Sequence, residues 1–319
     1  MTSPALPHNL SGALAAKAQG LSRIDAMKRS AAISQTYRGG GGSTAITTEA
    51  DALAYALARM PATYAAVVAC LNAITAIVPA FMPKSLLDCG AGPGTATYAA
   101  TQMFSLETIT LLDANPALRA LALHLADATA LSLHYELGDL LATLTKAHAA
   151  DLVVASYVVN ELPAAKHDQL ADALWAKTQN ILVVVEPGTP AGYARILALR
   201  ARLIAQGAHV IAPCPHDDAC PLASPDWCHF VQRLPRLRAH MALKSAEVPF
   251  EDEKFSYVAL SRMPVADRPA RVLAQPETTK VAVTAKLCTP AGLTYAKAPK
   301  RDKALYQRFK KLDWGDAVS

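Results

Sequence analysis

The chain has 319 residues, of which 52% are hydrophobic and 18% are charged, and it contains six cysteines. This composition excludes a disordered protein, because a disordered chain lacks the apolar side chains needed to offset the entropy lost on folding. It also excludes a small scaffold built on disulfides and favours a reducing compartment. The formal net charge of +5, from 31 Lys and Arg against 26 Asp and Glu, permits a nucleic-acid partner without requiring one.

The alanine-rich N-terminal part, residues 1–80, is expected to be helical. One or two helices are predicted within residues 1–37, and four consecutive glycines at 39–42 predict a flexible connection after them. A longer helix is predicted over residues 48–78. Residues 61–83 carry no charge, so a membrane span is an alternative, but the polar residues within this stretch favour a buried helix.

From residue 84 onward, short apolar runs alternate with helical segments. The predicted strands are residues 85–89, 108–113, 131–137, 151–159 and 181–187. Helices are predicted from about residue 95, at 116–126 and at 164–178. Strands that are apolar along their whole length and alternate with helices predict a mostly parallel sheet covered on both faces. Residues 81–192 are therefore expected to form a doubly wound, Rossmann-like core of the α/β class.

The pattern changes after residue 192. A helix at 191–206 is followed by an irregular stretch rich in Pro, Cys and His at 213–229. Further strands are predicted at 254–262, near 271–274 and at 280–287, and a basic tail is predicted at 297–311. We expect residues 193–319 to complete the core and to carry a cysteine-rich, metal-binding extension.

The strongest local motif is the glycine loop that follows the first predicted strand. Gly90, Gly92 and Gly94 lie between an apolar strand and a helix, so that the backbone can turn tightly and approach a ligand. Asp88 ends the strand before the loop, and Asp113 ends the next strand, where a carboxylate accepts hydrogen bonds from ribose hydroxyls. This set predicts a nucleotide-type cofactor site, and a Rossmann-like domain that binds nothing is the alternative.

The G-x-G-x-G spacing differs from that of NAD-binding domains and resembles the class I S-adenosylmethionine (SAM)-dependent methyltransferases. The resemblance implies that Asp139, after the third strand, contacts the adenine amino group; a helix cap is the alternative role. The Asn/Asp-Pro-Pro-aromatic loop of amino-methylating enzymes is replaced here by Asn160-Glu161-Leu162-Pro163. Glu161 is the candidate catalytic base, and a carboxylate at a helix start is the alternative.

A second motif lies in the irregular segment, whose cysteines are Cys214, Cys220 and Cys228. Three cysteines this close predict metal ligands rather than disulfides, and Cys288 is the best candidate for a fourth ligand. Four thiolates suit zinc or an iron–sulfur cluster, and the spacing does not separate the two. Zinc with His216 or His229 as the fourth ligand, or buried cysteines without a metal, are the alternatives. Cys70 and Cys89 are predicted to be small core residues.

Basic residues gather in two places. Around the cysteine segment they are Arg195, Arg200, Arg202, Arg233, Arg236, Arg238 and Lys244. In the C-terminal tail they are Lys297, Lys300, Arg301, Lys303, Arg308, Lys310 and Lys311. Phosphate binding needs such charge and makes affinity depend on salt. We therefore expect an RNA-binding surface, and a solvated charged face is the alternative.

Together with the glycine loop and residues 160–163, the stretch Pro-Cys-Pro-His…Cys-Pro…Trp-Cys-His-Phe at 213–230 resembles a known family. It is similar to the methyltransferase-like proteins of the small ribosomal subunit, over about residues 37–315. The resemblance implies association with small-subunit rRNA and ribosomal proteins during assembly. It also implies a [4Fe–4S] cluster on Cys214, Cys220, Cys228 and Cys288. We expect no membrane and no DNA partner.

Three functional hypotheses follow. The protein is a SAM-dependent rRNA methyltransferase with a structural iron–sulfur cluster, a non-catalytic rRNA-binding assembly factor, or a methyltransferase with structural zinc. The missing catalytic loop leaves open whether it is an enzyme. A bacterial protein of this kind would act in the cytoplasm and a eukaryotic one in the mitochondrial matrix. The basic, acid-poor first 45 residues are compatible with a mitochondrial presequence.

Overall fold

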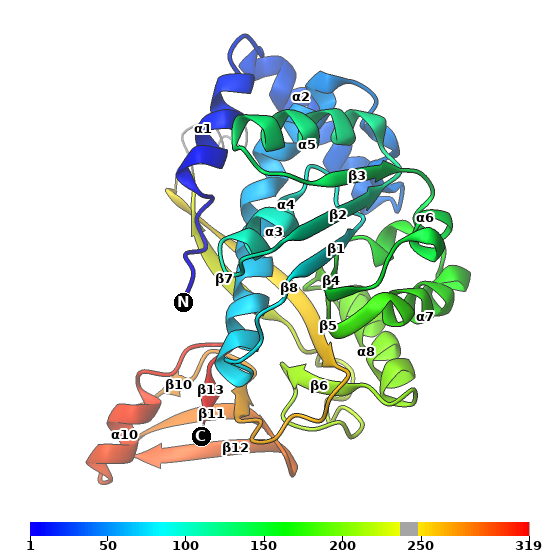
Figure 1. Ribbon diagram of the computed structural model, residues 1–319. Coiled ribbons are helices and arrows are strands. Elements are labelled where there is room, and N and C mark those ends of the chain that lie inside the picture. The colour runs from blue at the N-terminus through cyan, green and yellow to red at the C-terminus, as the bar shows by residue number, and fades with distance from the viewer. Residues whose placement is uncertain (237–247, 319) are drawn as a thin grey trace.

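Two β-sheets of unequal size organise the chain in the computed structural model, which describes residues 1–236 and 248–318 (Figure 1). The larger sheet has the strand order β3-β2-β1-β4-β5-β8-β6, and β7 pairs with β8. Its strands are β1 (Ser85–Cys89), β2 (Thr108–Asp113), β3 (His134–Leu137), β4 (Ala150–Ser156), β5 (Thr178–Pro187), β6 (His209–Ala212), β7 (Phe230–Pro235) and β8 (Phe250–Ser261).

Strands β1 to β5 are parallel, and β8 runs antiparallel to β5, β6 and β7. The chain winds from β1 outward to β3 and then returns to β4 on the other side of β1, so the switch point of the sheet lies between β1 and β4. The predicted doubly wound, mostly parallel, Rossmann-like sheet is therefore confirmed. The strands β6 and β7 are additions that the sequence pattern did not predict.

Successive side chains of the central strands enter different cores, which is why these strands are apolar along their whole length. On β5, Val183 packs into the core shared with α3 and α5, whereas Val184 packs into the core shared with α7 and α8. The covering helices are α4 (Thr95–Thr101), α5 (Pro116–Ala128), α6 (Leu140–Lys146), α7 (His167–Lys177) and α8 (Pro190–Ile204). Two short 3-10 helices, η2 (Val159–Glu161) and η3 (Ala164–Lys166), follow β4.

The N-terminal region is helical, as predicted. Its elements are α1 (His8–Lys17), α2 (Arg23–Arg38), the 3-10 helix η1 (Gly42–Ala45) and α3 (Glu49–Ile77). By length and composition α3 could cross a membrane, but 61% of its most apolar 18-residue stretch is buried inside the protein. It packs against α2, α4, α5 and β8, which supports the prediction of a buried helix.

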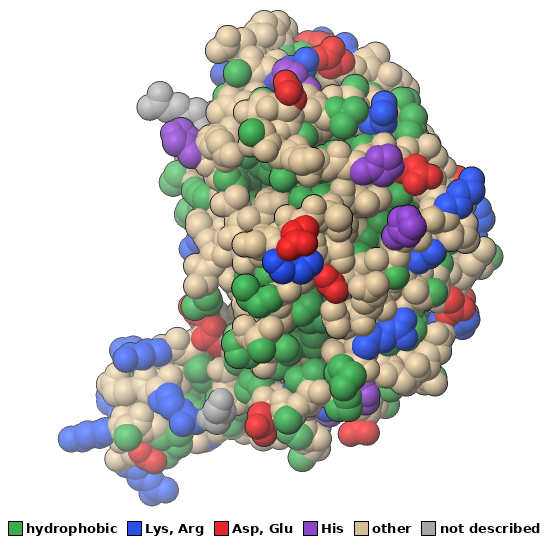
Figure 2. Space-filling view, in the orientation of Figure 1, with side chains coloured by type: hydrophobic (Ala, Val, Ile, Leu, Met, Phe, Trp, Pro, Cys, Tyr) green, Lys and Arg blue, Asp and Glu red, His purple; other side chains and the backbone are tan. Residues whose placement is uncertain are grey.

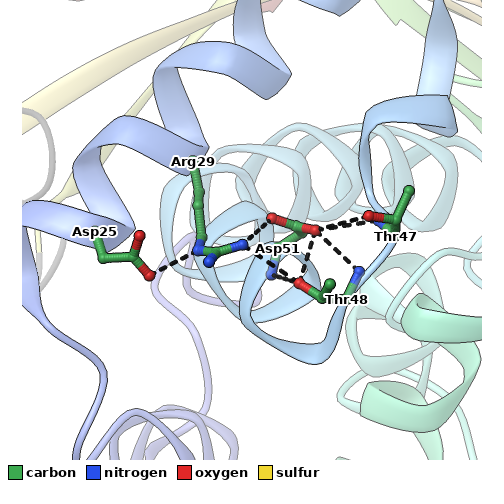
Figure 3. A network of polar contacts seen from close by, with 5 residues as sticks. All are labelled: Asp25, Arg29, Thr47, Thr48 and Asp51. Carbon is green, nitrogen blue, oxygen red and sulfur yellow. Dashed lines mark hydrogen bonds and ion pairs between the residues drawn. The ribbon is translucent and has the colours of Figure 1, made fainter.

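The start of α3 is fixed by a polar network that ties it to α2 (Figure 3). Thr48 caps the helix by accepting a hydrogen bond from the Asp51 backbone N–H, while the Asp51 carboxylate accepts one from the Thr48 N–H. Arg29 of α2 pairs with Asp51 at 2.6 Å and with Asp25 at 2.7 Å. Burial raises the pKa of Asp51, but the hydrogen bonds from Thr48 and Arg29 together outweigh it and bring the pKa to about 2.

The second sheet is formed by the C-terminal part of the chain and has the order β10-β11-β9-β13, with β12 paired to β11. Its elements are β9 (Ala270–Val272), β10 (Glu277–Thr278), β11 (Ala282–Thr289), β12 (Gly292–Pro299), α10 (Lys303–Phe309) and β13 (Ala317–Val318). It has a small core of its own that includes Val283, Leu287 and Phe309. The residues of the predicted basic tail, 297–311, include the end of β12 and α10. The division of the chain at residues 80 and 192 stays a prediction.

Candidate functional site

The glycine loop connects β1 to α4 and has the backbone geometry that only glycine adopts readily. Gly90, Gly92 and Gly94 have φ of 69°, 55° and 81°. A Cβ built on Gly90 would lie 2.3 Å from the Val158 side chain, so this position also requires the absence of a side chain. The backbone N–H groups of Gly90 and Ala91 both donate to the Leu112 carbonyl, at 2.8 and 3.1 Å, which ties the loop to the end of β2.

The two strand-end carboxylates have different roles. The Asp113 carboxylate accepts hydrogen bonds from the Gly92 N–H at 2.8 Å and the Asn115 N–H at 2.7 Å, and burial raises its pKa. Asp88 is fully buried, and its Oδ2 accepts from the N–H and the hydroxyl of Thr97 at the start of α4. Burial raises the pKa of Asp88 to about 7. Asp113 thus holds the loop from the cavity side, whereas Asp88 anchors α4 beneath it.

A cavity of about 30 Å³ lies over the loop. Of the predicted cofactor residues, Gly90, Gly92 and Asp113 line it, and Asp88, Gly94 and Asp139 do not. Asp139 instead caps α6 by accepting from the Ala142 N–H at 3.0 Å, which is the alternative role the sequence left open. Because a single water fills about 10–15 Å³ of such volume, the cavity has room for about two waters and not for a nucleoside.

The cavity is small because an N-terminal segment closes it. This segment, residues 41–46, is called the lid below. The Ser43 N–H donates to Glu161 Oε2 at 3.0 Å, and the Asn115 side-chain amide donates to the carbonyls of Ser43 and Ile46 at 3.1 and 2.9 Å. Burial raises the pKa of Glu161. Glu161, predicted as a candidate base, therefore holds the lid. The sequence did not reveal the lid, although the glycine run at 39–42 marks its beginning.

A larger cavity of about 560 Å³ adjoins the closed one. Four residues line both cavities: Tyr37, Tyr55, Thr63 and Tyr157. The larger cavity lies between α2, α3 and the chain that leaves β4 and β5. The carboxyl ends of parallel strands beside a switch point are the usual place for ligands in open α/β sheets.

The four cysteines predicted as metal ligands line a third cavity, of about 30 Å³. They are Cys214, which follows β6, Cys220 and Cys228 in the irregular segment, and Cys288 on β11. All six cysteines are free thiols, and Cys70 and Cys89 are buried in the core, as predicted. The tertiary structure thus brings together cysteines from two sheets.

The surroundings of these four thiols are buried and positively charged. Arg200 and Arg271 are 4% and 6% exposed. Arg271 lies directly opposite Cys288 in the pairing of β9 with β11. Burial raises the pKa of the Cys288 thiol to about 12, and it also raises the pKa of Cys214 and Cys228. Within residues 1–236 and 248–318, no three His, Cys, Asp or Glu side chains are grouped so as to hold a single metal ion.

The two histidines predicted as alternative zinc ligands have different neighbours. His216 Nε2 lies 3.6 Å from Cys288 Sγ. The His229 ring stacks on Trp227 at 4.9 Å and meets the edge of Trp314 at 4.6 Å, with its Nδ1 3.3 Å from the Trp227 carbonyl. His216 is therefore next to the cysteines, whereas His229 is part of an aromatic cluster.

The two predicted basic regions differ in how far their side chains are exposed. Near the cysteine segment, Arg200 is buried and four other arginines pair with carboxylates: Arg195, Arg202, Arg233 and Arg236. Arg238 and Lys244 lie outside the described residues. In the second sheet the predicted basic residues are all exposed: Lys297, Lys300, Arg301, Lys303, Arg308, Lys310 and Lys311. Figure 2 shows Lys and Arg side chains gathered over β12 and α10.

Comparison with solved structures finds distant likenesses. The magnesium protoporphyrin IX methyltransferase of Synechocystis PCC 6803 with bound SAM has a TM-score of 0.42 and 12% identity, covering 63% of this chain and 80% of that one. The precorrin-6y C5,15-methyltransferase of Geobacter metallireducens has a TM-score of 0.41 and 12% identity, covering 60% and 84%.

Comparison with curated proteins finds closer relatives. The human mitochondrial ribosome assembly protein METTL17 is 31% identical over 303 residues, which is 85% of this chain and 63% of the human protein. The Rsm22-cox11 tandem protein 2 of Schizosaccharomyces pombe, also mitochondrial, is 29% identical over 201 residues, covering 56% of this chain and 27% of the yeast protein. This chain therefore spans less than two thirds of either relative. Residues 49–319 match the family described as mitochondrial small ribosomal subunit Rsm22, and the chain belongs to this Rsm22 family.

Proposed function

We propose that this protein is a SAM-binding, methyltransferase-like factor that acts on or binds small-subunit rRNA in ribosome assembly and carries a structural [4Fe–4S] cluster. The observation that carries the proposal is the convergence of Cys214, Cys220, Cys228 and Cys288 on one enclosed cavity. Membership of the Rsm22 family and the similarity to a human ribosome assembly protein support the ribosomal part.

Four cysteine thiolates are the usual ligands of an iron–sulfur cluster and are also a ligand set of structural zinc. The family resemblance of the cysteine segment favours the cluster. Zinc on three cysteines and His216 is the alternative, because His216 lies beside Cys288.

The charges around the cavity support an anionic centre. Arg200 donates to the His216 carbonyl at 2.8 Å, and Arg271 donates to the carbonyls of Pro213 and Gly315. Neither arginine forms an ion pair with a carboxylate within the described ranges. A buried guanidinium without a counter-charge is costly. Four thiolates, whose charge an iron–sulfur core neutralises only in part, would supply that counter-charge.

A structural role follows from where the ligands lie. Cys288 belongs to the second sheet, whereas Cys214 follows β6 of the large sheet. A centre bound by both would close a long loop of chain and hold the second sheet against the first. The exposed lysines and arginines of β12 and α10 would then be presented to RNA phosphates on a fixed surface. The protein would act in a bacterial cytoplasm or, in a eukaryote, in the mitochondrial matrix.

The glycine loop and Asp113 support SAM binding: Gly90 and Gly92, which line the cavity, would let the cofactor approach the backbone, and Asp113 would accept hydrogen bonds from its ribose. SAM supplies the methyl group when it is bound. The closed cavity requires that the lid move before SAM enters. Binding of rRNA without methyl transfer is the second candidate function, and one observation favours it: the Glu161 carboxylate, the candidate base, is engaged by the Ser43 N–H.

Anaerobic purification followed by visible absorption and metal analysis tests the cluster. We expect a brown protein that contains iron and inorganic sulfide, and a colourless protein that contains zinc would contradict the proposal. Mass spectrometry of small-subunit rRNA with and without the gene separates the two functional candidates. A missing methyl group in the deletion strain supports the enzyme, whereas unchanged rRNA with impaired subunit assembly supports the binding factor.

A further inference from the structure

The cavity of about 560 Å³ beside the closed cofactor site has no assigned occupant. Its volume is within the range of about 300–1,000 Å³ that is usual for sites that take small organic groups. Three tyrosines from separate parts of the chain line it: Tyr37 at the end of α2, Tyr55 on α3 and Tyr157 after β4. We call it the tyrosine cavity.

The tyrosine rings are held firmly in place. Tyr37 and Tyr55 stack with their centroids 5.9 Å apart and their planes 18° from parallel. The Tyr157 hydroxyl donates to Glu253 at 2.9 Å, and the Tyr157 backbone has a φ of 58°. A left-handed backbone conformation is strained for a tyrosine, and such strain collects at functional sites. Rigid aromatic faces of this kind are the surfaces on which unpaired nucleobases stack.

The charges in the cavity favour a neutral ring over a phosphate. Its two guanidiniums are already paired: Arg59 with Glu253 at 3.0 Å, and Arg195 with Glu186 at 2.6 Å. A phosphate would therefore find no uncompensated cation there. The Oδ1 atom of Asn160 is buried without a hydrogen-bond partner in the described part of the chain. After rotation, the Asn160 amide can bond to the edge of a base.

We propose that the tyrosine cavity binds a single unstacked nucleobase of RNA, next to the site that holds the methyl donor. This inference rests on the proposed function and adds to it the class of group that enters the protein. The phosphates on either side of the base would stay outside the cavity. The four residues shared with the cofactor cavity would separate the two ligands.

The test uses the full-length protein and the fluorescent nucleotide 2-aminopurine riboside monophosphate, free and within a short single-stranded RNA. Stacking on a tyrosine changes the emission of this base. We expect Tyr37→Phe to keep the change and Tyr37→Ala to weaken binding about 5- to 150-fold, the equivalent of about 1–3 kcal/mol for one base stacked on an aromatic ring. Tyr295→Ala, which removes an exposed tyrosine of β12, should leave the free nucleotide signal unchanged.

A second variant, Ser34→Trp, fills the cavity without removing a tyrosine and should also abolish the signal. Circular dichroism confirms that each variant is folded. An emission change that is absent, or equal in wild type, Tyr37→Ala and Ser34→Trp, overturns the inference. Displacement of the nucleotide by S-adenosylhomocysteine overturns it too, because the cavity would then belong to the cofactor.

RNA binding measured separately by anisotropy keeps the two proposals apart. Bound RNA without a base signal contradicts only the tyrosine cavity. A base signal from the free nucleotide without RNA binding contradicts the proposed function and leaves the cavity assignment supported.

Discussion

The glycine-loop site and the four-cysteine cavity are both enclosed and equally small, yet their buried charges are balanced in opposite ways. In the glycine-loop site the buried charges are carboxylates, and Asp88 and Asp113 accept hydrogen bonds from the protein's own backbone. In the cysteine cavity the buried charges are the cations Arg200 and Arg271, which face four thiols. The protein's own N–H groups satisfy both oxygens of Asp113, whereas Asp88 Oδ1 is buried without a hydrogen-bond partner among the described residues. The cysteine cavity holds two buried arginines that pair with no carboxylate among the described residues, so under the proposed function we expect it to depend far more on what it binds.

The largest expected effect is on the cysteine side. Cys288→Ser should abolish the visible absorption and the bound iron, and should lower the midpoint of thermal unfolding because the second sheet loses its link to the first. The matched control is Cys70→Ala, which changes a buried core cysteine outside the cavity and should keep the colour. Equal colour in the two variants would remove Cys288 from the ligand set.

On the glycine side, Gly90→Ala should lower the free energy of unfolding by about 2–5 kcal/mol. The left-handed φ contributes about 1–2 kcal/mol and the clash with Val158 about 1–3 kcal/mol. Gly20→Ala is the control, because Gly20 has a φ of 92° with open space around it, so only the smaller strain cost of about 1–2 kcal/mol applies. Denaturant unfolding measures both variants. Equal losses of unfolding free energy would show that the Val158 side chain moves aside at little energetic cost.

The buried carboxyl of Asp88 predicts a pH dependence. Its pKa is about 7 in the folded protein and about 4 in the unfolded chain, so the unfolded state releases its proton first as the pH rises. This group therefore lowers stability progressively between about pH 4 and pH 7, by up to about 4 kcal/mol, and has no further effect above that range.

Asp88→Asn should remove this decline. The free energy of unfolding of the variant should therefore rise relative to that of wild type from pH 4 to pH 7. The control is Asp172→Asn. Hydrogen bonds from Arg202 lower the pKa of Asp172 to about 2, so its contribution is lost only below about pH 4. Its unfolding curve should stay parallel to that of wild type between pH 5 and pH 8. A difference between Asp88→Asn and wild type that does not change with pH would show that Asp88 is ionised throughout.

The smallest effect is expected at the lid. Glu161→Ala removes the acceptor of the Ser43 N–H, a charged hydrogen bond of about 1.5–3 kcal/mol at most. Backbone amides of residues 41–46 should exchange with deuterium faster, by about tenfold or more, while global stability changes little. Glu107→Ala, at an exposed glutamate, is the control. Unchanged exchange at Ser43 would mean that Asn115 alone holds the lid closed.

How far the sequence alone leads differs between the two regions. The strands β1, β2 and β5 and the glycine loop are local features, so their positions follow from apolar runs and from glycines in the chain order. The predicted strand 151–159 ends early, at Ser156, because Tyr157 adopts a left-handed backbone conformation that no pattern in the sequence announces. The sequence of residues 297–311 resembles a tail because charged residues dominate it. Its few apolar side chains, such as Phe309, pack α10 against the second sheet.

By itself, the sequence determined the doubly wound sheet, the glycine loop and the cluster of Cys214, Cys220 and Cys228, since each depends on residue type and short-range spacing. Only the tertiary structure decided that Asp88 and Asp139 serve neighbouring helices, that Glu161 holds a lid, and that Cys288 joins three cysteines from another part of the chain. These outcomes depend on which segments pack together. Packing is set by the whole core rather than by any local run of residues.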